Sequence, residues 1–468
     1  MGRWRIRPGL LLVLVLGLTA CQSPLARVLG QARVGSQDPD VQVFFNHNPQ
    51  AHYRDPVHGV ERAGDNLEAV LVEAIGSARR RIDVAVHELR LPGIAAALAE
   101  RQRAGVSVRV ILEDRYRQPW SLRTEADIAR MDRREQQRLE QYRRLADRNG
   151  DGQLSEAEAI AGDAVRQLEA AGIPIRDDRA GGGGSGLMHH KFVIVDDHLL
   201  LTGSANFTAS DIHGDAGVPA SRGNANNLLR IESPALAALF RQQFETMWGQ
   251  NGLLPRFGPQ KPSEPARTVQ VGRTAVTVFF DPVDPLLGWE GSGNGLIGEW
   301  LATMKRSADL ALFVFSEQRL ADILGDRHRQ GATVRILVEP QFAWRPYSEL
   351  LDVMGLQLRD RRCRQEAGNH LWQPPLRTAG TPRLPDGDLL HHKFAVLDGE
   401  TVITGSHNWS SSAADRNDET LLILRNPALA ARYEQEFERL YREADLGPNR
   451  RLQRLLARTA ARCDRSTP

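Results

Sequence analysis

The chain has 468 residues, which is enough for two domains, because a single domain usually contains about 100 to 200 residues. Charged residues make up 25% of it and the formal net charge is only +2, so the composition lacks the strongly basic footprint typical of many nucleic-acid-binding proteins. Beyond the amino terminus, we expect no segment to be apolar enough to cross a membrane.

The amino terminus has the pattern of an export signal. Three arginines among the first seven residues precede an apolar run, residues 9–18, that is too short to span a bilayer stably. The sequence Leu-Thr-Ala-Cys at 18–21 resembles the bacterial lipobox, although an ordinary signal peptide with a coincidental cysteine would look similar. We therefore expect a lipoprotein signal peptide over residues 1–20 and lipidation at Cys21. The protein would be exported and anchored to a bacterial membrane, on its periplasmic or outer face. Loss of the three arginines would lower the formal net charge from +2 to −1.

The rest of the chain repeats one series of segments. The matching pairs are 41–45 and 276–280, 82–86 and 310–314, 105–111 and 331–337, and 224–229 and 417–422. Each half then has Pro-Ala-Leu, at Pro234 and Pro427, opening an amphipathic helical pattern. Because strand-like runs alternate with helical patterns throughout, we expect two similar α/β domains with largely buried sheets.

The first half also contains an insertion, residues 115–171, without a counterpart in the second. Its centre, residues 147–158, reads DRNGDGQLSEAE between helical patterns at about 124–146 and 155–171. This spacing matches the calcium loop of an EF-hand, although a polar turn between two helices is the alternative. The expected ligands are Asp147, Asn149, Asp151, Gln153 through its backbone carbonyl, and Glu158. We expect this helix-loop-helix to bind Ca²⁺ in a structural or regulatory role, and we expect no metal in catalysis.

One motif, H-x-K-x4-D, occurs in both halves, and each copy is followed by Gly-Ser-x-Asn. On a strand, residues i and i+2 leave the same face, so the histidine and the lysine of each copy project together. The candidate catalytic residues are His189, Lys191 and Asp196 in the first copy and His391, Lys393 and Asp398 in the second. Candidate phosphate-binding or supporting residues are Ser204, Asn206, Ser406 and Asn408.

These residues resemble the signature of the phospholipase D superfamily, and the resemblance covers nearly the whole mature chain. It implies two α/β/α sandwich domains related by a pseudo-twofold axis, with both motifs in one active site of a monomer. It also implies a two-step displacement at phosphorus through a phosphohistidine. His189 would be the nucleophile and His391 the acid, while the lysines hold the phosphate oxygens.

Other positions in the motifs have expected supporting roles. We expect Asp196 and Asp398 to lie away from the phosphate and to fix strand ends, and we expect the second histidine of each motif to pack on the opposite strand face. A carboxylate that orients an imidazole in this family is matched by Glu419, whereas the aligned residue in the first half is Asn226. The sequence leaves open which histidine Glu419 contacts.

The repeat sets the expected domain boundaries. The first domain covers residues 38–251, a linker follows at 252–273, the second domain covers 274–446, and residues 447–468 form a carboxy-terminal tail. Cys363 and Cys463 could form a disulfide in an exported protein or remain free thiols, and the sequence leaves both possibilities open.

Three functions are compatible with these features. The first is a phospholipase D-type phosphodiesterase that hydrolyses phospholipid head groups, because a lipidated Cys21 would hold the site near a membrane. The second is a nonspecific extracytoplasmic endonuclease of the same superfamily, with nucleic acid as its partner. The third, from another class, is a catalytically inactive, calcium-dependent, membrane-anchored binding protein, against which the two intact motifs argue.

Overall fold

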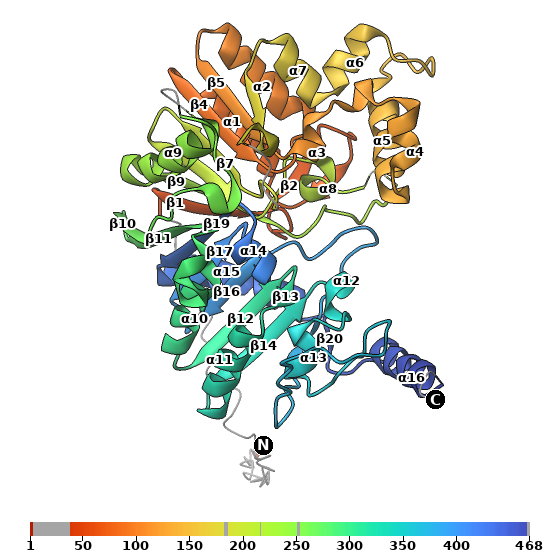
Figure 1. Cartoon of the computed structure of the whole chain (residues 1–468), viewed down its shortest axis with the longest axis vertical. Helices are drawn as coiled ribbons and strands as arrows, with labels where there is room; N and C mark the ends of the chain where they lie inside the picture. The colour runs from red at the N-terminus through yellow and green to blue at the C-terminus, as the bar shows by residue number, and fades with distance from the viewer. Residues whose placement is uncertain (3–37, 182–185, 216, 250–252, 466–468) are drawn as a thin grey trace. The chain divides into compact units, whose positions relative to one another are not determined.

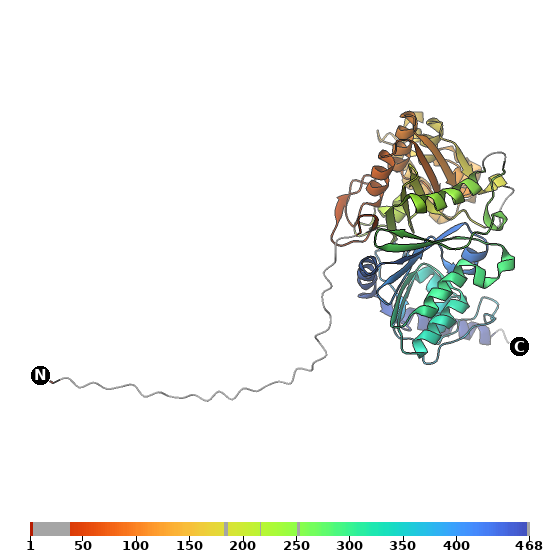
Figure 2. The same ribbon diagram turned by 90° about the vertical axis from the view of Figure 1, so that its left-hand side faces the viewer.

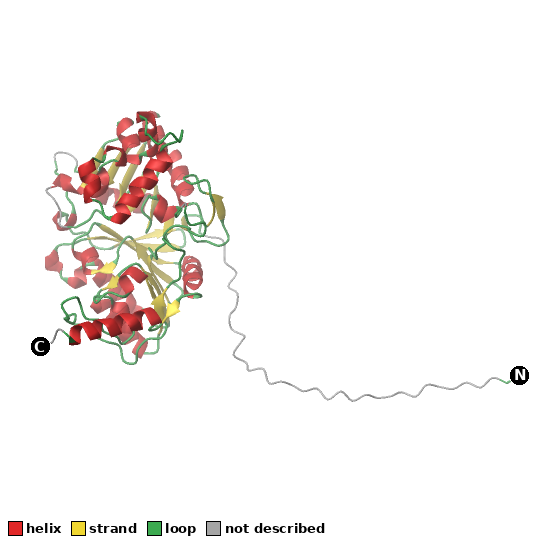
Figure 3. Cartoon of the chain, turned by 90° about the vertical axis from the view of Figure 1, so that its right-hand side faces the viewer, coloured by secondary structure: helices red, strands yellow, loops and turns green. Residues whose placement is uncertain are grey.

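The computed structural model describes residues 1–2, 38–181, 186–215, 217–249 and 253–465 (Figure 1). The predicted signal peptide, apart from its first two residues, and the predicted lipidation site Cys21 lie outside this part of the chain. Residues 36–468 form one compact unit. Within it, strands lie between helices, as the yellow and red elements of Figure 3 show.

Two mixed sheets carry the fold. The strands of the first sheet, in spatial order, are β1 (Val41–Phe45), β9 (Asn227–Glu232), β8 (Leu199–Gly203), β7 (Lys191–Val195), β4 (Arg81–Val86), β5 (Ser107–Leu112) and β6 (Ile175–Asp177). Those of the second are β10 (Arg267–Val271), β11 (Thr274–Asp281), β19 (Glu419–Arg425), β17 (Thr401–Gly405), β16 (Lys393–Leu397), β12 (Ser307–Leu312), β14 (Thr333–Val338), β15 (Ala379–Thr381) and β20 (Asp445–Leu446). From β11 to β15 the second sheet repeats the order of the first, with β10 and β20 added at its edges. Two small ribbons, β2 (His52–Arg54) with β3 (Glu61–Ala63) and β13 (Phe315–Ser316) with β18 (Trp409–Ser410), complete the strands.

Helices cover the sheets on both sides (Figure 2). In the first half they are α1 (Leu67–Gly76), α2 (Pro92–Arg103), α3 (Asp114–Arg117), α4 (Glu125–Arg130), α5 (Arg133–Ala146), α6 (Glu156–Gly162), α7 (Ala164–Ala170), α8 (Ala209–Ile212) and α9 (Pro234–Trp248). In the second half they are α10 (Gly293–Thr303), α11 (Gln318–Arg329), α12 (Pro340–Ala343), α13 (Glu349–Val353), α14 (Ser411–Asp415), α15 (Pro427–Tyr441) and α16 (Arg450–Asp464). The two Pro-Ala-Leu segments start α9 and α15 as expected, because proline fits the first turn of a helix and Ser233 and Asn426 cap the free N–H groups.

One expected match between the halves was out of register by two residues. Asp83 pairs with Arg109 at 2.8 Å, and Asp309 pairs with Arg335 at 2.6 Å. These equivalent ion pairs align residue 82 with residue 308 rather than with 310. Both segments are apolar and rich in alanine, so the hydrophobic pattern alone did not distinguish the two registers.

The two halves share a hydrophobic core. One buried cluster contains side chains of both sheets and of α9 and α15. Phe240 of α9 packs edge-on against Phe280 of β11, with ring centroids 5.0 Å apart, and Tyr433 of α15 packs in the same way against Phe45 of β1 at 5.1 Å. Each long helix therefore contacts the sheet of the other half, which explains why the two repeats form one compact unit.

The insertion is smaller than the sequence suggested. Its last helix, α7, contributes Ala164, Val165 and Leu168 to the core of the first half and leads into β6, just as α13 leads into β15 in the second half. The expected helix at 124–146 is divided into α4 and α5, and that at 155–171 into α6 and α7, where Asp163 accepts hydrogen bonds from the first N–H groups of α7. Residues unique to the first half thus end near residue 162.

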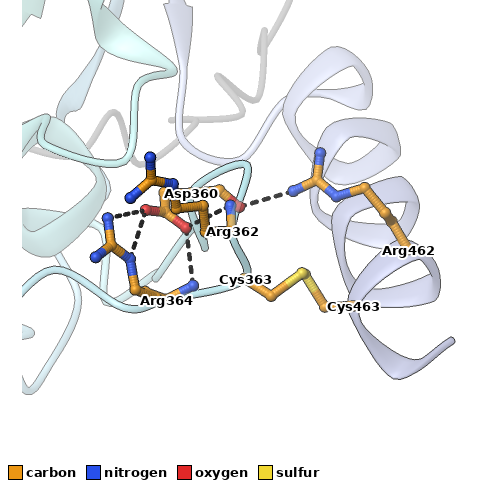
Figure 4. The surroundings of a disulfide bond; sticks show 6 residues. All are labelled: Asp360, Arg362, Cys363, Arg364, Arg462 and Cys463. Carbon is orange, nitrogen blue, oxygen red and sulfur yellow. Dashed lines mark hydrogen bonds and ion pairs between the residues drawn. A yellow bond between two sulfur atoms is a disulfide. The ribbon is translucent and has the colours of Figure 1, made fainter. Parts of the chain in front are cut away.

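The predicted linker and tail both contain regular structure. The linker ends in β10, which pairs with β11 through a turn at Gly272, whose φ of 51° favours glycine. The tail contains α16, and Cys463 on this helix forms a disulfide with Cys363 (Figure 4). The Arg462 side chain also donates a hydrogen bond to the backbone oxygen of Asp360.

Arginines gather on both sides of this disulfide, although the whole chain is nearly neutral. The exposed ones are Arg359, Arg361, Arg362, Arg364, Arg450, Arg451, Arg454, Arg458, Arg462 and Arg465. A local basic surface therefore exists that overall composition does not reveal, because acidic residues elsewhere balance it. Among the described helices, none combines the length and apolarity needed to span a membrane.

Candidate active site

The two H-x-K segments enter the sheets beside each other, and each is held by the opposite half. The backbone N–H of His189 donates to the carbonyl oxygen of Asp418 at 3.0 Å, and that of His391 donates to the carbonyl oxygen of Ala225 at 3.1 Å. A Cβ atom on Gly186, just before the first motif, would lie 1.9 Å from the backbone oxygen of Arg416, so only glycine fits where the halves approach.

Each motif histidine is oriented by a side chain from the other half. His189 Nδ1 lies 2.8 Å from Glu419 Oε2, and His391 Nδ1 lies 2.9 Å from Asn226 Oδ1. Asn226 Oδ1 also accepts a hydrogen bond from Ser204, so it is an acceptor and the His391 ring must donate through Nδ1. In both rings the remaining nitrogen, Nε2, is the one left to act on a substrate.

The Gly-Ser turns support this arrangement rather than the phosphate. Ser406 Oγ donates to Glu419 Oε2 at 2.6 Å, and Ser204 Oγ donates to Asn226 Oδ1 at 2.7 Å. A Cβ atom on Gly203 would lie 2.2 Å from the backbone oxygen of Asn227, so the close approach of β8 and β9 requires glycine. Each hydroxyl proton is already engaged, so in this structure the serines have the supporting role among the two predicted for them.

The asparagines of the same turns are different. The Oδ1 atoms of Asn206 and Asn408 are buried and have no hydrogen-bond partner within the described chain. A buried amide oxygen without a partner is costly, and such groups often mark a site that a ligand or water completes. Each Oδ1 atom needs a donor such as water, so contact with a phosphate oxygen would have to come from the Nδ2 group of the asparagine.

The motif lysines are almost completely buried, because only 1% of the surface of each residue is exposed to solvent. Lys191 Nζ donates to the backbone oxygen of His189, and Lys393 Nζ donates to that of His391, both at 2.6 Å. Burial lowers the pKa of Lys191 to about 8, although the carboxylate of Glu419 acts in the opposite direction. Burial and the charge of Lys191 lower the pKa of Lys393 well below its usual value. Two buried cations side by side form a site that an anion would stabilise.

The surroundings of the motif histidines disfavour their charged form. Burial, together with Lys191 and Lys393, lowers the pKa of both His189 and His391 well below 6.5. Burial raises the pKa of Glu419 to about 7, although Lys191 acts in the opposite direction. A phosphate between the lysines would raise the histidine pKa values, because a nearby negative charge favours the imidazolium form.

Asp196 and Asp398 lie at the opposite ends of their strands from the histidines. Asp196 accepts hydrogen bonds from the backbone N–H groups of residues 79–81, and Asp398 from those of residues 305–307. Burial raises the pKa of each carboxyl, but these N–H groups outweigh it and the pKa is lowered overall. The two aspartates therefore hold the ends of β7 and β16 against the segments that lead into β4 and β12.

The second histidine of each motif is held in the core by hydrogen bonds. His190 Nδ1 lies 2.8 Å from Thr420 Oγ1, and His392 Nε2 lies 3.0 Å from Glu436 Oε1. Neither ring is exposed to solvent. Both face away from the motif lysines, as strand alternation requires.

Three residues near the site were missed by the sequence reasoning. His87 makes an edge contact with His189, with ring centroids 4.9 Å apart, whereas Phe313 occupies the equivalent place beside His391 at 4.7 Å. His407, inside the second Gly-Ser-x-Asn, has its Nε2 atom 3.3 Å from Asp281 Oδ2. With the repeat aligned in its correct register, His87 and Phe313 occupy equivalent positions. The sequence therefore contained a signal for these two residues, but the two-residue shift in the alignment concealed it.

The predicted calcium loop forms the turn between α5 and α6. Asp147 accepts hydrogen bonds from the N–H groups of Gly150 and Gly152, whose φ values of 73° and 80° permit the tight turn. Glu158 accepts from the N–H groups of residues 148 and 149, and Ser155 caps α6. The loop has the oxygen ligands, the tight turn and the flanking helices of a calcium loop. Its carboxylates, however, bind loop N–H groups instead of converging within 4.8 Å, and among described residues only Glu113, Asp114 and Asp178 do so.

The fold and the paired motifs define a class of proteins: two α/β repeats that bring two H-x-K segments together. A family model described as "Cardiolipin synthase, PLD-like domain" matches residues 71–248 and 299–441, which is more than half of the chain. The chain belongs to this PLD-like family.

Similar proteins point to the same superfamily. The chain is 34% identical over 143 residues to a mitochondrial cardiolipin hydrolase of Xenopus laevis, covering 30% of this chain and 57% of that protein. It is 21% identical over 168 residues to a phospholipase D of Rickettsia bellii (strain RML369-C), covering 36% and 70%. The chain thus spans little more than half the length of the cardiolipin hydrolases from Xenopus that it matches.

A solved structure supports the fold over almost the whole chain. The phosphatidylserine synthase of Haemophilus influenzae Rd KW20 superposes with a TM-score of 0.52, covering 92% of this chain and 94% of that one. The two sequences are 13% identical, so this likeness concerns the fold alone.

Proposed function

We propose that this protein is a phosphodiesterase of the phospholipase D type that removes head groups from phospholipids through a phosphohistidine. The observation that carries the proposal is the reciprocal orientation of the two histidines, His189 by Glu419 and His391 by Asn226. A nucleophile and an acid need different environments, and a carboxylate on one side with an amide on the other supplies that difference.

In the first step, His189 Nε2 attacks the phosphorus of the substrate. An N–P bond forms while the P–O bond to the head group breaks, and protonated His391 gives its proton to the departing alcohol oxygen. Glu419, bonded to Nδ1 of His189, stabilises the positive charge that develops on this ring.

In the second step, neutral His391 takes a proton from water. The water oxygen bonds to phosphorus as the P–N bond breaks, which restores His189 and leaves a phosphatidate. Lys191 and Lys393 would hold the non-bridging oxygens, and the amides of Asn206 and Asn408 would complete their contacts. Because each half supplies one histidine, we place a pseudo-twofold axis between two phospholipase D-like sandwich domains, and one chain suffices for the site.

The substrate and the location belong to the same proposal. A lipid anchor at Cys21 would hold the exported protein on a membrane and bring the site to phospholipid head groups. Nucleic acid is the second candidate substrate, and the exposed arginines around the disulfide are a specific observation in its favour. Phospholipid is the preferred candidate because two similar proteins are named as a cardiolipin hydrolase and a phospholipase D.

We further propose that the loop 147–158 binds Ca²⁺ through Asp147, Asn149, Asp151, Gln153 and Glu158. The ion would neutralise the loop carboxylates and fix the angle between α5 and α6, with no part in the phosphoryl chemistry. On binding, the carboxylates would exchange their present N–H partners for the ion.

The substrate assay uses purified mature protein with mixed bacterial phospholipids, single-stranded DNA and double-stranded DNA, each with and without calcium. Release of free head group supports the proposal, and nicked DNA without head-group release would replace it by an endonuclease. Activity on neither would leave a calcium-dependent binding protein. His391→Ala, which should be inactive, and His52→Ala, at an exposed histidine in β2, serve as paired controls.

A further inference from the structure

A cavity of about 820 Å³ lies between the body of the first half and the helices of the insertion. Residues of α2 and the segment that follows β4 line one side. Residues of α5 and α6, the two helices joined by the predicted calcium loop, line the other. The volume is within the range of about 300 to 1,000 Å³ that is usual for small-molecule sites.

Most of the cavity wall is apolar. The side chains that dominate it are Val57, Leu91, Trp120, Tyr142, Leu145 and Ile160. Leu145, at 39% exposure, is one of the more exposed large apolar residues of the chain. A wall of this kind fits a hydrocarbon chain better than a sugar or a nucleotide.

One end of the cavity carries a buried positive charge that is incompletely paired. The Arg90 side chain is 9% exposed and stacks over the Trp120 ring, with its guanidinium carbon 4.8 Å from the ring centroid. Its Nε lies 3.4 Å from Glu88, but its Nη2 atom is buried without a hydrogen-bond partner. Arg138 lies 3.6 Å from the same carboxylate. Both guanidinium groups contact Glu88, and Asp163 and Asp211 add negative charge nearby. The Nη2 atom of Arg90 nevertheless lacks an acceptor, which an oxygen of an anionic ligand would supply.

This charged end lies beside the catalytic motif. Glu88 and Arg90 follow His87, whose ring contacts His189. Val314 and Ser316 occupy the equivalent positions in the second half, so the charged end is particular to the first. The cavity thus combines a candidate anion-binding group, Arg90, with a largely apolar wall.

We propose that this cavity binds one alkyl chain of an anionic amphiphile, with the carboxylate or phosphate of the ligand at Arg90. The apolar wall gives affinity for the chain, and the unpartnered Nη2 of Arg90 gives a preference for an anionic end. The inference does not depend on the phosphodiesterase activity, since its probe, tetradecanoate, contains no phosphodiester.

The test is calorimetric titration of the mature protein with monomeric fatty acids. Because each buried methylene contributes about a fourfold change in affinity, dodecanoate should bind roughly 15-fold more weakly than tetradecanoate. Tetradecanol should bind more weakly than tetradecanoate, and Arg90→Gln should reduce that difference.

Two matched variants locate the site. Ala96 lines the cavity from α2 and is exposed, so Ala96→Trp should fill the cavity without disturbing the core and should lower affinity for tetradecanoate at least 10-fold. Ala129→Trp, at an exposed alanine of α4 outside the cavity wall, should leave binding unchanged. Equal loss in both variants or unchanged affinity in Ala96→Trp would each overturn the proposal. So would equal affinities for the two chain lengths.

Discussion

His189 Nδ1 lies 2.8 Å from Glu419 Oε2, although the two residues are 230 positions apart and belong to different repeats. The equivalent contact of His391 is with Asn226, an amide. The two motif histidines, alike in sequence, therefore sit in different electrostatic surroundings. The proposed division of labour between nucleophile and acid follows from this difference.

Removing either motif histidine should abolish turnover, because each performs a different part of one reaction. We expect His189→Ala and His391→Ala each to lower kcat by at least about 10³-fold, and the double variant to be scarcely worse than either, since the two act as a unit. Steady-state rates with a phospholipid substrate provide the measurement. A single variant that kept more than about a tenth of the activity would contradict the shared site at that histidine.

Glu419→Gln should separate activity from stability. A carboxyl with a raised pKa is ionised in the unfolded chain above about 4.5 but in the folded chain only above about 7. Its burial therefore costs stability that increases from pH 4.5 to 7, by up to about 3 kcal/mol. We expect the variant to melt at a higher temperature at pH 8 while kcat/KM falls roughly 10²- to 10⁴-fold. The wild-type rate should decline below about pH 7 as Glu419 becomes protonated, and this decline should be absent in Glu419→Gln.

The reciprocal variant, Asn226→Asp, provides the control for Glu419→Gln, because it changes the residue that contacts the other motif histidine. A carboxylate beside His391 should raise the pKa of this ring, so the alkaline limb of the pH–rate profile should move to higher pH. An unchanged profile in both variants would show that neither residue tunes the histidine that it contacts.

Calcium removal should affect stability before it affects chemistry. Binding to the native state alone would raise the free energy of unfolding by about 2.7 kcal/mol when free calcium is a hundredfold above its dissociation constant. Glu158→Gln and Asp147→Ala should abolish the increase in melting temperature, whereas Glu140→Gln, at an exposed residue of α5, should preserve it. Immediate and complete loss of activity on chelation, with the melting temperature unchanged, would instead indicate a metal in the chemistry.

The disulfide should stabilise the carboxy-terminal helix. Cys363 and Cys463 are 100 residues apart, so their bond constrains a long segment of the unfolded chain. We expect the double serine variant to lose about 2 to 4 kcal/mol of stability and to keep its turnover, because the motifs lie elsewhere. Reductant should destabilise the wild type and leave the variant unchanged; destabilisation of both by the same amount would point to another target.

Much of the fold and the site was predictable because the chain is duplicated. Two copies of one motif identified the candidate histidines, lysines and asparagines. The alternation of side chains along a strand predicted that His189 and Lys191 lie on one face. The sequence left open which histidine Glu419 contacts, since that depends on how the halves pack. Short apolar repeats such as 82–86 also have no internal feature that fixes their register, and this hid the equivalence of His87 and Phe313.

Other features lay beyond sequence reasoning for different physical reasons. The bond between Cys363 and Cys463 required their Cα atoms to come within bridging distance, here 5.5 Å. The arginine surface around it is hidden in a nearly neutral composition. The cavity beside Arg90 is lined by α2 on one side and by α5 and α6 on the other, and no local sequence pattern specifies this arrangement.

The most direct test of the central claim is to trap the covalent intermediate. Enzyme mixed with a labelled phosphodiester and quenched during turnover should carry one substrate phosphoryl group on His189, still esterified to the part of the substrate that is not the leaving alcohol. Its N–P bond should be stable in base and labile in acid, and mass spectrometry should map it to His189. His391→Ala should retain more of the label when the leaving group is a good one, because its second step lacks the base. Label on His391 would reverse the assigned roles, and absence of label under slow turnover would contradict the phosphohistidine mechanism in favour of direct attack by water.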